Sequence, residues 1–497
     1  MAFVTRTRIT AVLLLCLVIC DGCEGGRPFD EGNEGGASKK SNKSKYKSKD
    51  VGADKVDDAS DKSKDVGDDK VDDVSTKSKD VDVDKVDDAS NKTKDVDAGK
   101  VGDGLDKTKD VGVGKVGSDV KSFNVLDYGA KADGKTDSSI NFIRTFKAAC
   151  NFRGDAMMVI PKGNFLIGPV LFSGPCFNPS PLIVQAEGMV KAQSDISYFT
   201  GGADNTDWIT FQSLKNGVIL TGDGTFHGQG ALTWKYNDCA HKSKCVRLPS
   251  NMKFVRVNDT IIRGIKSVDA KGFHIFVTVS SNVKIYNVNV QAPGNSPNTD
   301  GIHISKSNKI EISESVIATG DDCVSIIHGT SEISIKNVTC GPGHGFSIGS
   351  LGHYDDEADV SQISVTNSTL KGTTNGARIK TYKTDSPSKA SNIFFKDLIL
   401  ENVANPIIID QEYGNRAIAQ ASRVSISDVL FENIRGTSVS KIAVQLLCSK
   451  VNPCSGVEIK NVKLEYSGRP NDPRPFSSNC TNAKVIYAGT QSPPPCS

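Results

Sequence analysis

The sequence is poor in several residue types that mark common classes of binding protein. Its 497 residues include only 2 Trp and 5 Met, and aromatic residues make up 6%. This composition argues against a protein that binds through aromatic platforms or a Met-rich groove. The 60 basic and 58 acidic side chains nearly cancel, to a formal charge of +2. No strong basic field therefore indicates a nucleic-acid partner.

Long apolar runs are also lacking. No stretch approaches about 18 apolar residues, so we expect no membrane-spanning helix. One shorter run, residues 11–20, follows Arg6 and Arg8 and has the length of the apolar region of a secretory signal. We therefore expect residues 1–25 to be a signal peptide and the mature chain to be secreted, without membrane association. A short buried helix is the alternative, but the polar, Gly-rich residues 21–38 give it nothing to pack against.

Zinc-site spacings are missing as well. The ten cysteines after the signal form no Cys-x-x-Cys pair, and no His-x-x-x-His occurs, which argues against a zinc site. An even number of cysteines in a secreted chain predicts disulfides instead. Short intervals favour local pairing, although spacing alone does not fix the partners, at Cys239/Cys245, Cys323/Cys340, Cys448/Cys454 and Cys480/Cys496.

The balanced total charge conceals two unlike segments. Residues 47–121 contain 16 Lys and 21 Asp, whereas residues 122–497 carry 37 basic and 32 acidic side chains, a net charge of +5. The first segment is a 15-residue repeat, in which K-S-K-D or K-T-K-D begins at Lys47, Lys62, Lys77, Lys92 and Lys107. Its valines do not share one face of a helix, and it has too little apolar surface to offset the entropy of folding.

We therefore predict a disordered, mixed-charge linker over residues 26–121. An alternative role is adhesion to charged polymers, or capture of calcium by the Asp pairs that begin at Asp57, Asp72 and Asp87. The linker is favoured because the pairs lack the Gly and the terminal Glu of a calcium-binding loop.

A second periodicity begins after this segment. Short stretches alternate β-branched and polar residues, and each is followed at a fixed offset by Asn, Asp or Glu and then by a second short strand. Copies begin at Val283, Ile310, Ile333, Ile363, Ile393, Val424 and Val457. No helix of about ten residues fits between them, which excludes leucine-rich and α/β repeats.

The fold that we predict is all-β, a parallel β-helix (solenoid) over residues 122–497 with one copy per turn. Apolar residues at helical spacing predict a short helix around residues 138–150 that caps the N-terminal end of the stack. A β-sandwich of regular hairpins is the alternative. It would require the offset residue after alternate strands only.

The solenoid brings polar residues together. Residues one turn apart lie on neighbouring strands, about 4.8 Å apart. Asp300 is followed after 21 and 22 residues by Asp321 and Asp322, and His344 follows 22 residues later. We expect these four side chains to form a ladder across three successive turns. Carboxylates this close raise the pKa of at least one of them, as glycoside hydrolysis requires: one acid protonates the leaving oxygen, and the others activate water.

A cationic strand follows the ladder. Arg378 and Lys380 lie on the same side of it because strand side chains alternate, and cations beside carboxylates suit an anionic sugar. Ordinary turn residues or a surface salt-bridge cluster are the alternatives. They are disfavoured because each ladder residue lies in a Gly-containing motif, where we expect glycine to let a ligand approach the backbone. We interpret the other histidines as structural or surface residues: His227, His241, His274, His303, His328 and His353.

Four motifs carry a resemblance to a known family: S-P-N-T-D-G-I-H-I at 296–304, T-G-D-D-C-V-S-I at 319–326, C-G-P-G-H-G-F-S-I-G-S-L-G at 340–352 and R-I-K-T-Y at 378–382. Over residues 122–490 the chain resembles plant polygalacturonases, glycoside hydrolases built on a right-handed parallel β-helix, and it looks most similar to the pollen-type exopolygalacturonases. The resemblance implies a secreted cell-wall enzyme that hydrolyses the α-1,4 links of polygalacturonate (de-esterified pectin) with inversion, from chain ends. It implies a monomer with no metal or other cofactor.

The resemblance also implies roles for residues. Asp321 resembles the proton donor, Asp300 and Asp322 the pair that orients the attacking water, and His344 the supporting histidine beside them. Arg378 and Lys380 resemble binders of the substrate carboxylate, and Tyr413 an aromatic residue that contacts the sugar. Three alternatives stay open: endo cleavage, a non-catalytic pectin-binding wall protein on the same scaffold, and a pectin lyase. Glycosylation is permitted at Asn42, Asn91, Asn258, Asn337, Asn367 and Asn479.

Overall fold

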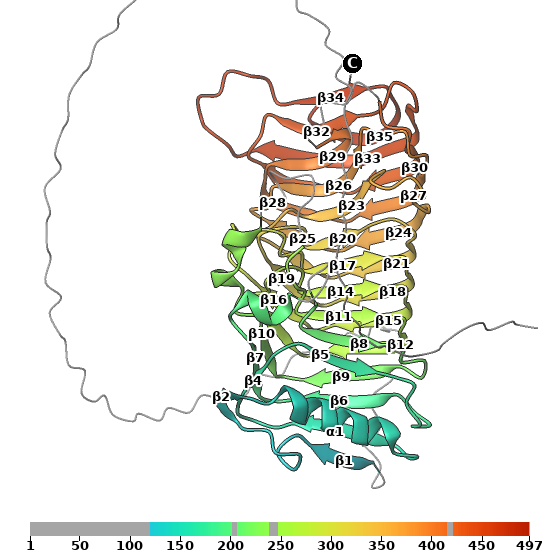
Figure 1. The fold of residues 1–497 in the computed structure, drawn as a ribbon. Helices are drawn as coiled ribbons and strands as arrows, with labels where there is room; N and C mark the ends of the chain where they lie inside the picture. Colours follow the sequence, from blue (N-terminus) through green and yellow to red (C-terminus); the bar gives the residue numbers. More distant parts are fainter. Residues whose placement is uncertain (1–119, 201–205, 238–246, 415–420, 497) are drawn as a thin grey trace, which may run out of the picture. The chain divides into compact units, whose positions relative to one another are not determined.

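The computed structural model describes residues 120–200, 206–237, 247–414 and 421–496, which form a stack of short strands (Figure 1). The signal peptide expected at residues 1–25, nearly all of the linker expected at 26–121, and the pair Cys239/Cys245 lie outside the described residues. No described helix is long and apolar enough to cross a membrane.

The strands fall into three files, in each of which a strand pairs in parallel with its counterpart one turn further on. The first file consists of β1 (Lys121–Asn124), β3 (Ala156–Ile160), β6 (Leu182–Ala186), β9 (Val218–Gly222), β12 (Asn258–Arg263), β15 (Ser281–Tyr286), β18 (Asn308–Ser313), β21 (Ser331–Lys336), β24 (Val360–Thr366), β27 (Lys389–Lys396), β30 (Ser425–Glu432), β33 (Cys454–Tyr466) and β35 (Ala483–Ser492).

The second file consists of β2 (Asp133–Asp137), β4 (Asn164–Ile167), β7 (Met189–Ala192), β10 (Thr225–His227), β13 (Lys266–Val268), β16 (Asn289–Gln291), β19 (Val316–Ala318), β22 (Thr339–Cys340), β25 (Thr369–Lys371), β28 (Ile399–Val403) and β31 (Arg435–Ser438). The first two files form one 24-stranded sheet, because β33 pairs with both β30 and β31.

The third file is a separate 11-stranded sheet. It consists of β5 (Val170–Ser173), β8 (Ile209–Gln212), β11 (Met252–Val255), β14 (Ile275–Thr278), β17 (Ile302–Ser305), β20 (Val324–Ile326), β23 (Phe346–Leu351), β26 (Asn375–Tyr382), β29 (Asn405–Tyr413), β32 (Ile442–Leu447) and β34 (Ser477–Thr481). Three short 3₁₀ helices complete the secondary structure: η1 (Ile196–Phe199), η2 (Gly230–Leu232) and η3 (Trp234–Tyr236).

The parallel β-helix predicted from the sequence is confirmed. Every strand pairing among the described residues is parallel, which excludes a sandwich of hairpins. The predicted helix is also present, as α1 (Ser139–Asn151). It lies at the N-terminal end of the stack (Figure 1) and buries Phe142, Phe146 and Ala149 against the first turns. The alternation of apolar and polar residues thus specifies the strands, and the helix covers the end that they leave open.

The core consists of aliphatic columns in strict register. In the first file Ile310 lies between Val283 and Ile333, and the column continues through Ile363 and Ile393. All of these side chains are buried. Each turn therefore covers the apolar face of the next one, so the long chain is stable without a globular core.

One predicted copy of the repeat is out of register. The strand pairing places Val429, not Val424, opposite Ile393 and Val457, so the copy is V-L-F-E-N-I from Val429. Left-handed backbone explains the error. Asp428, with φ 56°, and Asn433, with φ 54°, both have left-handed backbone and lie on either side of residues 429–432. The predicted copy took Asp428 as the residue that follows the strand, whereas the structure uses Asn433 there. The sequence pattern alone does not distinguish these two residues.

The offset residues of the repeat have a backbone function. Asn287, Asn337, Asn367 and Asp397 all have φ between 48° and 56°, where Asn and Asp are enriched among residues other than glycine. They turn the chain from the first file into the second. A side-chain ladder adds hydrogen bonds between turns, as from Asn433 Nδ2 to Asp397 Oδ1 at 2.9 Å.

Three of the expected local disulfides are present, Cys323–Cys340, Cys448–Cys454 and Cys480–Cys496. The structure adds Cys150–Cys176, which joins the end of α1 to the segment after β5. The glycosylation sites Asn258, Asn337, Asn367 and Asn479 are exposed. Their glycosylation stays a prediction.

Candidate active site

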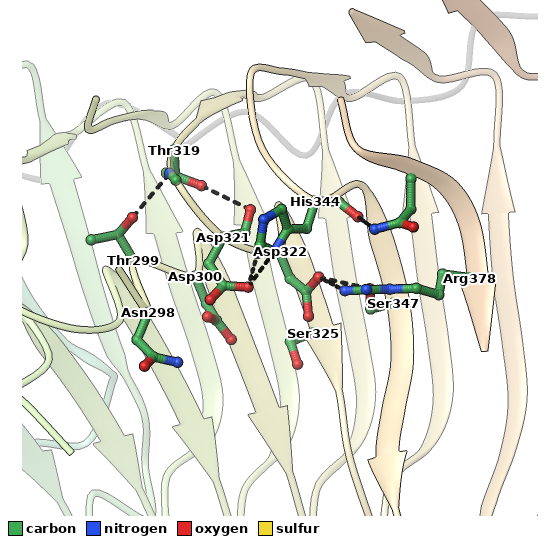
Figure 2. Close-up of polar contacts among 12 residues, drawn as sticks. Asn298, Thr299, Asp300, Thr319, Asp321, Asp322, Ser325, His344, Ser347 and Arg378 are labelled. Carbon is green, nitrogen blue, oxygen red and sulfur yellow. Dashed lines mark hydrogen bonds and ion pairs between the residues drawn. The ribbon is translucent and has the colours of Figure 1, made fainter. Parts of the chain in front are cut away.

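The third file brings the predicted ladder together. Strands β17, β20 and β23 are neighbours, with Val324 between Ile302 and Phe346. Asp300, Asp321/Asp322 and His344 each lie two or three residues before the strand of their own turn, so the shared register places them side by side (Figure 2). The ladder across three successive turns is confirmed.

Asp321 and His344 form the outer part of the ladder. The Nδ1 atom of His344 lies 2.9 Å from Asp321 Oδ1, and the His344 N–H donates to the Asp321 carbonyl at 2.8 Å. Both side chains are partly exposed. The hydrogen bond to Asp321 raises the pKa of His344, with burial opposing it, because the carboxylate stabilises the imidazolium form.

Asp322 is the buried part of the ladder. Its Oδ1 accepts hydrogen bonds from Arg378 Nη2 at 2.5 Å and from Ser347 Oγ at 2.7 Å, and its Oδ2 accepts one from Lys380 Nζ at 2.9 Å. Burial alone would raise the pKa of Asp322, but the Lys380 and Arg378 charges outweigh it and hold that pKa below its usual range. Asp322 is therefore a carboxylate even in mild acid.

Asp300 behaves in the opposite way. Burial, followed by the charges of Asp321 and Asp322, raises its pKa well above the ordinary value. The expected divergence of pKa values among neighbouring carboxylates is thus present. It separates Asp300, which holds a proton readily, from Asp322, which does not.

Arg378 and Lys380 lie on one side of β26, as strand alternation predicts, but their contacts are with the protein. Both side chains are buried and reach Asp322 from two turns away. Lys380 Nζ also lies 5.1 Å from the ring centre of Tyr413. Both cations therefore stabilise the charge of Asp322.

The glycines of the motifs have a role different from the one we expected. A Cβ atom on Gly320 would lie 2.0 Å from the Ser296 carbonyl oxygen, and one on Gly345 would lie 2.1 Å from that of Asn375. These glycines let adjacent turns of the backbone pack closely. They serve the stacking of turns that aligns the ladder.

A pocket of about 300 Å³ opens on the ladder. Five of the candidate site residues line it, Asp300, Asp321, Asp322, Lys380 and Tyr413, and the other two, His344 and Arg378, contact the lining carboxylates. The pocket is also lined by three histidines that we interpreted from the sequence as structural or surface residues: His303, His328 and His353.

His303 had a signal in the sequence. It aligns with Ser325, Ser347 and Arg378 in adjacent strands of the third file. Each of these residues stands between two apolar residues, as in I-H-I, V-S-I, F-S-I and A-R-I. A polar residue at the centre of such a triplet points outward, onto the face that carries the ladder.

The loop after β23 forms another wall of the pocket. Its buried Glu357 accepts hydrogen bonds from the backbone N–H groups of Gly352 and His353, both at 2.6 Å, and of Tyr354 at 3.0 Å. Glu357 also lines the pocket, with Tyr354 and Tyr382. Since its carboxylate binds three successive backbone groups, Glu357 fixes this wall.

Asp321, Asp322 and His344 could together hold a cation, because one ligand atom from each lies within 4.8 Å of the others. The charges nearby disfavour this use. Arg378 and Lys380 already bind both oxygens of Asp322, and a metal ion there would be repelled by two buried cations.

Comparison with known proteins identifies the family. Residues 150–490 match the family model described as glycosyl hydrolases family 28, which spans more than half of the chain. The chain belongs to glycosyl hydrolase family 28. This family 28 chain is similar to plant proteins over most of their length. It is 44% identical to an exopolygalacturonase of Arabidopsis thaliana, and the alignment covers 75% of this chain and 87% of that protein.

Two further comparisons agree. An exopolygalacturonase of Platanus acerifolia is 41% identical, with 75% of this chain and 96% of that protein covered. The crystal structure of an exopolygalacturonase from Thermotoga maritima matches with a TM-score of 0.62 at 20% identity, over 74% of this chain and 92% of that one. This structural likeness confirms the right-handed β-helix fold of the family 28 domain.

Proposed function

We propose that this family 28 protein is a secreted exopolygalacturonase, which hydrolyses the α-1,4 links of de-esterified pectin from chain ends with inversion. The observation that carries the proposal is the set of three carboxyl groups that line one pocket, in which Lys380 and Arg378 hold Asp322 ionised and Asp321 is the most exposed. Inverting hydrolysis requires carboxyl groups in different protonation states on opposite sides of the scissile bond. The names of the plant relatives support the substrate class.

In the proposed reaction, Asp321 donates a proton to the leaving glycosidic oxygen, and Asp300 and Asp322 orient the attacking water. His344 supports Asp321 through the 2.9 Å contact. The water proton passes to Asp300, so proton uptake and release balance within the site. Asp321 is suited to protonating substrate because it is the most exposed of the three carboxylates.

The proposed substrate-binding residues are Lys380, Arg378 and Tyr413. Lys380 and Tyr413 line the pocket, and a galacturonate carboxylate would find there the only strong positive charge that the described lining provides. A sugar face packs against the tyrosine ring in this arrangement. Arg378 acts from beneath, through Asp322.

Relatives named exopolygalacturonase favour attack at a chain end. The pocket over the ladder, of about 300 Å³, can hold a terminal sugar. We further propose that the enzyme acts extracellularly in the cell wall as a monomer, after removal of residues 1–25, with residues 26–121 as a linker ahead of the catalytic domain at 122–497.

The test is the time course of products from polygalacturonate incubated with the full secreted chain. Monomeric galacturonate from the earliest time points is expected. Early release of longer oligomers would indicate endo cleavage, products that absorb in the ultraviolet would indicate a lyase, and binding without turnover would indicate a wall-binding protein. Asp321→Asn should abolish turnover while the fold survives, and Asp355→Asn, an exposed neighbouring change, should not.

A further inference from the structure

We propose that His303 is a positioning residue for Asp300: its Nδ1–H donates to the Asp300 carboxylate, and so holds that carboxylate ionised and oriented toward the attacking water. This inference rests on the proposed function, in which Asp300 receives the water proton. It concerns a residue that the sequence motifs alone did not assign to the site.

The contact is direct and buried. His303 Nδ1 lies 2.8 Å from Asp300 Oδ2, and each side chain is about one-tenth exposed or less. Asp300 lies in the turn before β17, and His303 points outward from that strand. Because the imidazole contacts Oδ2, Oδ1 is left to accept a hydrogen bond from water.

The imidazole ring is held in place from two sides. It stacks on Phe273 with ring centres 4.0 Å apart and 8° between the planes, and the edge of Phe276 lies at 5.2 Å. The guanidinium group of Arg247 lies 4.9 Å from the Phe273 ring centre. A ring packed in this way has one orientation, so the direction of its Nδ1–H is fixed.

The hydrogen bond from His303 opposes the effects that raise the pKa of Asp300. Burial lowers the pKa of His303 to about 3, so the imidazole is neutral and donates from one nitrogen. The pKa of Asp300 is raised by burial and by Asp321 and Asp322, which opposes its use as a base. Other charged and titratable groups act on the pair, namely Lys380, Arg247, His328 and His344. A donated hydrogen bond stabilises the carboxylate against its acidic neighbours.

The proposed role of His303 does not require it to donate or accept a proton during hydrolysis. During hydrolysis the water oxygen bonds to the anomeric carbon, its proton goes to Asp300, and the bond to the leaving oxygen breaks as Asp321 protonates that oxygen. His303 keeps its Nδ1–H throughout. It acts by fixing the acceptor, which makes it a positioning residue rather than a catalytic one.

The test compares two variants of the full chain. His303→Phe keeps a ring against Phe273 but removes the donor, whereas His303→Gln keeps a side-chain N–H. For the Phe variant we expect kcat to fall about tenfold to a hundredfold, the range for a hydrogen bond to a charged group, and the acid limb of the kcat profile to move to higher pH. KM for polygalacturonate should stay within about twofold. The Gln variant should recover much of the loss.

His227→Phe is the matched control. His227 is half-buried on β10, with Nε2 3.6 Å from Asp269 Oδ2, so the same replacement removes an imidazole beside a carboxylate away from the pocket. Its kcat and acid limb should equal those of the wild type.

Three results would overturn the inference: a His303→Phe variant with the wild-type acid limb, one in which only KM changes, or wild-type protein in which Nδ1 of His303 carries no proton. The last is read by NMR of the wild-type chain with isotope-labelled histidine, so it does not depend on whether a variant folds. Wild-type protein that releases no galacturonate would instead contradict the proposed function itself.

Discussion

Lys380 holds Asp322 from two turns away: its Nζ lies 2.9 Å from Asp322 Oδ2, and both side chains are buried. The pair joins β26 to the turn before β20 across the intervening β23. An ion pair in this position links the stability of the stack to the ionisation of the site.

Replacing Lys380 should therefore destabilise the fold as well as the site. We expect Lys380→Met to lower the free energy of unfolding by about 3 kcal/mol at pH 7, since removing one partner leaves a buried charge that Arg378 compensates only in part. Urea denaturation measures the change. Lys371→Met is the control, because Lys371 pairs with Glu401 on the exposed surface, and it should cost no more than about 0.5 kcal/mol.

The same variant should shift the acid side of the stability profile. The folded pKa of Asp322 lies below its unfolded value, so this carboxylate stabilises the fold above its unfolded pKa, and the stability is lost as pH falls through the folded pKa. Without Lys380 the folded pKa rises, and the gain in stability above the unfolded pKa shrinks. Identical wild-type and variant profiles below pH about 5 would contradict this account.

Asp300 makes the opposite contribution, and its removal should stabilise the protein. Its folded pKa is raised, so stability falls as pH rises from the unfolded to the folded pKa. We expect Asp300→Asn to raise the free energy of unfolding at pH 7, because burial and the charges of Asp321 and Asp322 disfavour the ionised form of Asp300, and to reduce turnover severely. Thermal unfolding at pH 7 and pH 4 checks the claim, because the difference should shrink in acid. A loss of stability at pH 7 would show that the hydrogen bond to His303 outweighs the repulsion.

The sequence predicts the fold because the repeat is local. The alternation in stretches such as Ile310–Ser313 and the left-handed Asn337 are each readable within six residues. The exact register is not, as the misplacement of Val424 and Val429 shows. The interval between copies varies with loop length, and only the pairing of strands decides which apolar residue enters a column.

The residues of the candidate site that recur at the spacing of one turn could be predicted from the sequence. Asp300, Asp321 and His344 recur at 21 to 23 residues, so a solenoid aligns them. The loop wall at Glu357 lies outside this rule, because a loop between strands follows no repeat. Lys380 lines the pocket and also binds the buried carboxylate of Asp322. The sequence spacing does not reveal this second contact, which arises because a buried cation is stabilised beside a buried carboxylate.

Glu357 should control substrate affinity through the loop that it anchors. Its carboxylate binds the N–H groups of residues 352–354, and His353 of that loop packs against Tyr382, which packs against Tyr413. In Glu357→Gln one acceptor oxygen becomes an NH2 group, which cannot accept a hydrogen bond from the backbone N–H groups, so we expect the loop to be held less firmly. We expect KM for polygalacturonate to rise roughly tenfold, the equivalent of a lost charge-assisted hydrogen bond, with a smaller change in kcat.

Asp355→Asn is the matched control for this loop. Asp355 lies two residues before Glu357 and its side chain is exposed. The variant removes the same charge without removing the loop anchor, so KM should be unchanged. If both variants raised KM equally, the charge of the loop rather than its anchoring would be responsible.

Lys271 should make the stability of the N-terminal turns depend on pH. Its buried Nζ donates to the carbonyl oxygens of Gln193, at 2.8 Å, and of Gly228, and lies 4.5 Å from the Phe199 ring centre. It thereby ties together the turns of β7, β10 and β13. Burial lowers its pKa to about 7, whereas the unfolded value is near 10.4.

Between these two values the unfolded chain binds the extra proton, so stability should rise with pH across that window. We expect the free energy of unfolding of the wild type, relative to Lys271→Met, to increase by about 1 to 4 kcal/mol between pH 7 and pH 10. Because the carbonyl contacts favour the charged form of Lys271, we expect an increase in the free energy of unfolding below the upper value of this range. Urea denaturation of both proteins at several pH values measures the difference, and a constant difference would show that Lys271 stays charged in the folded protein.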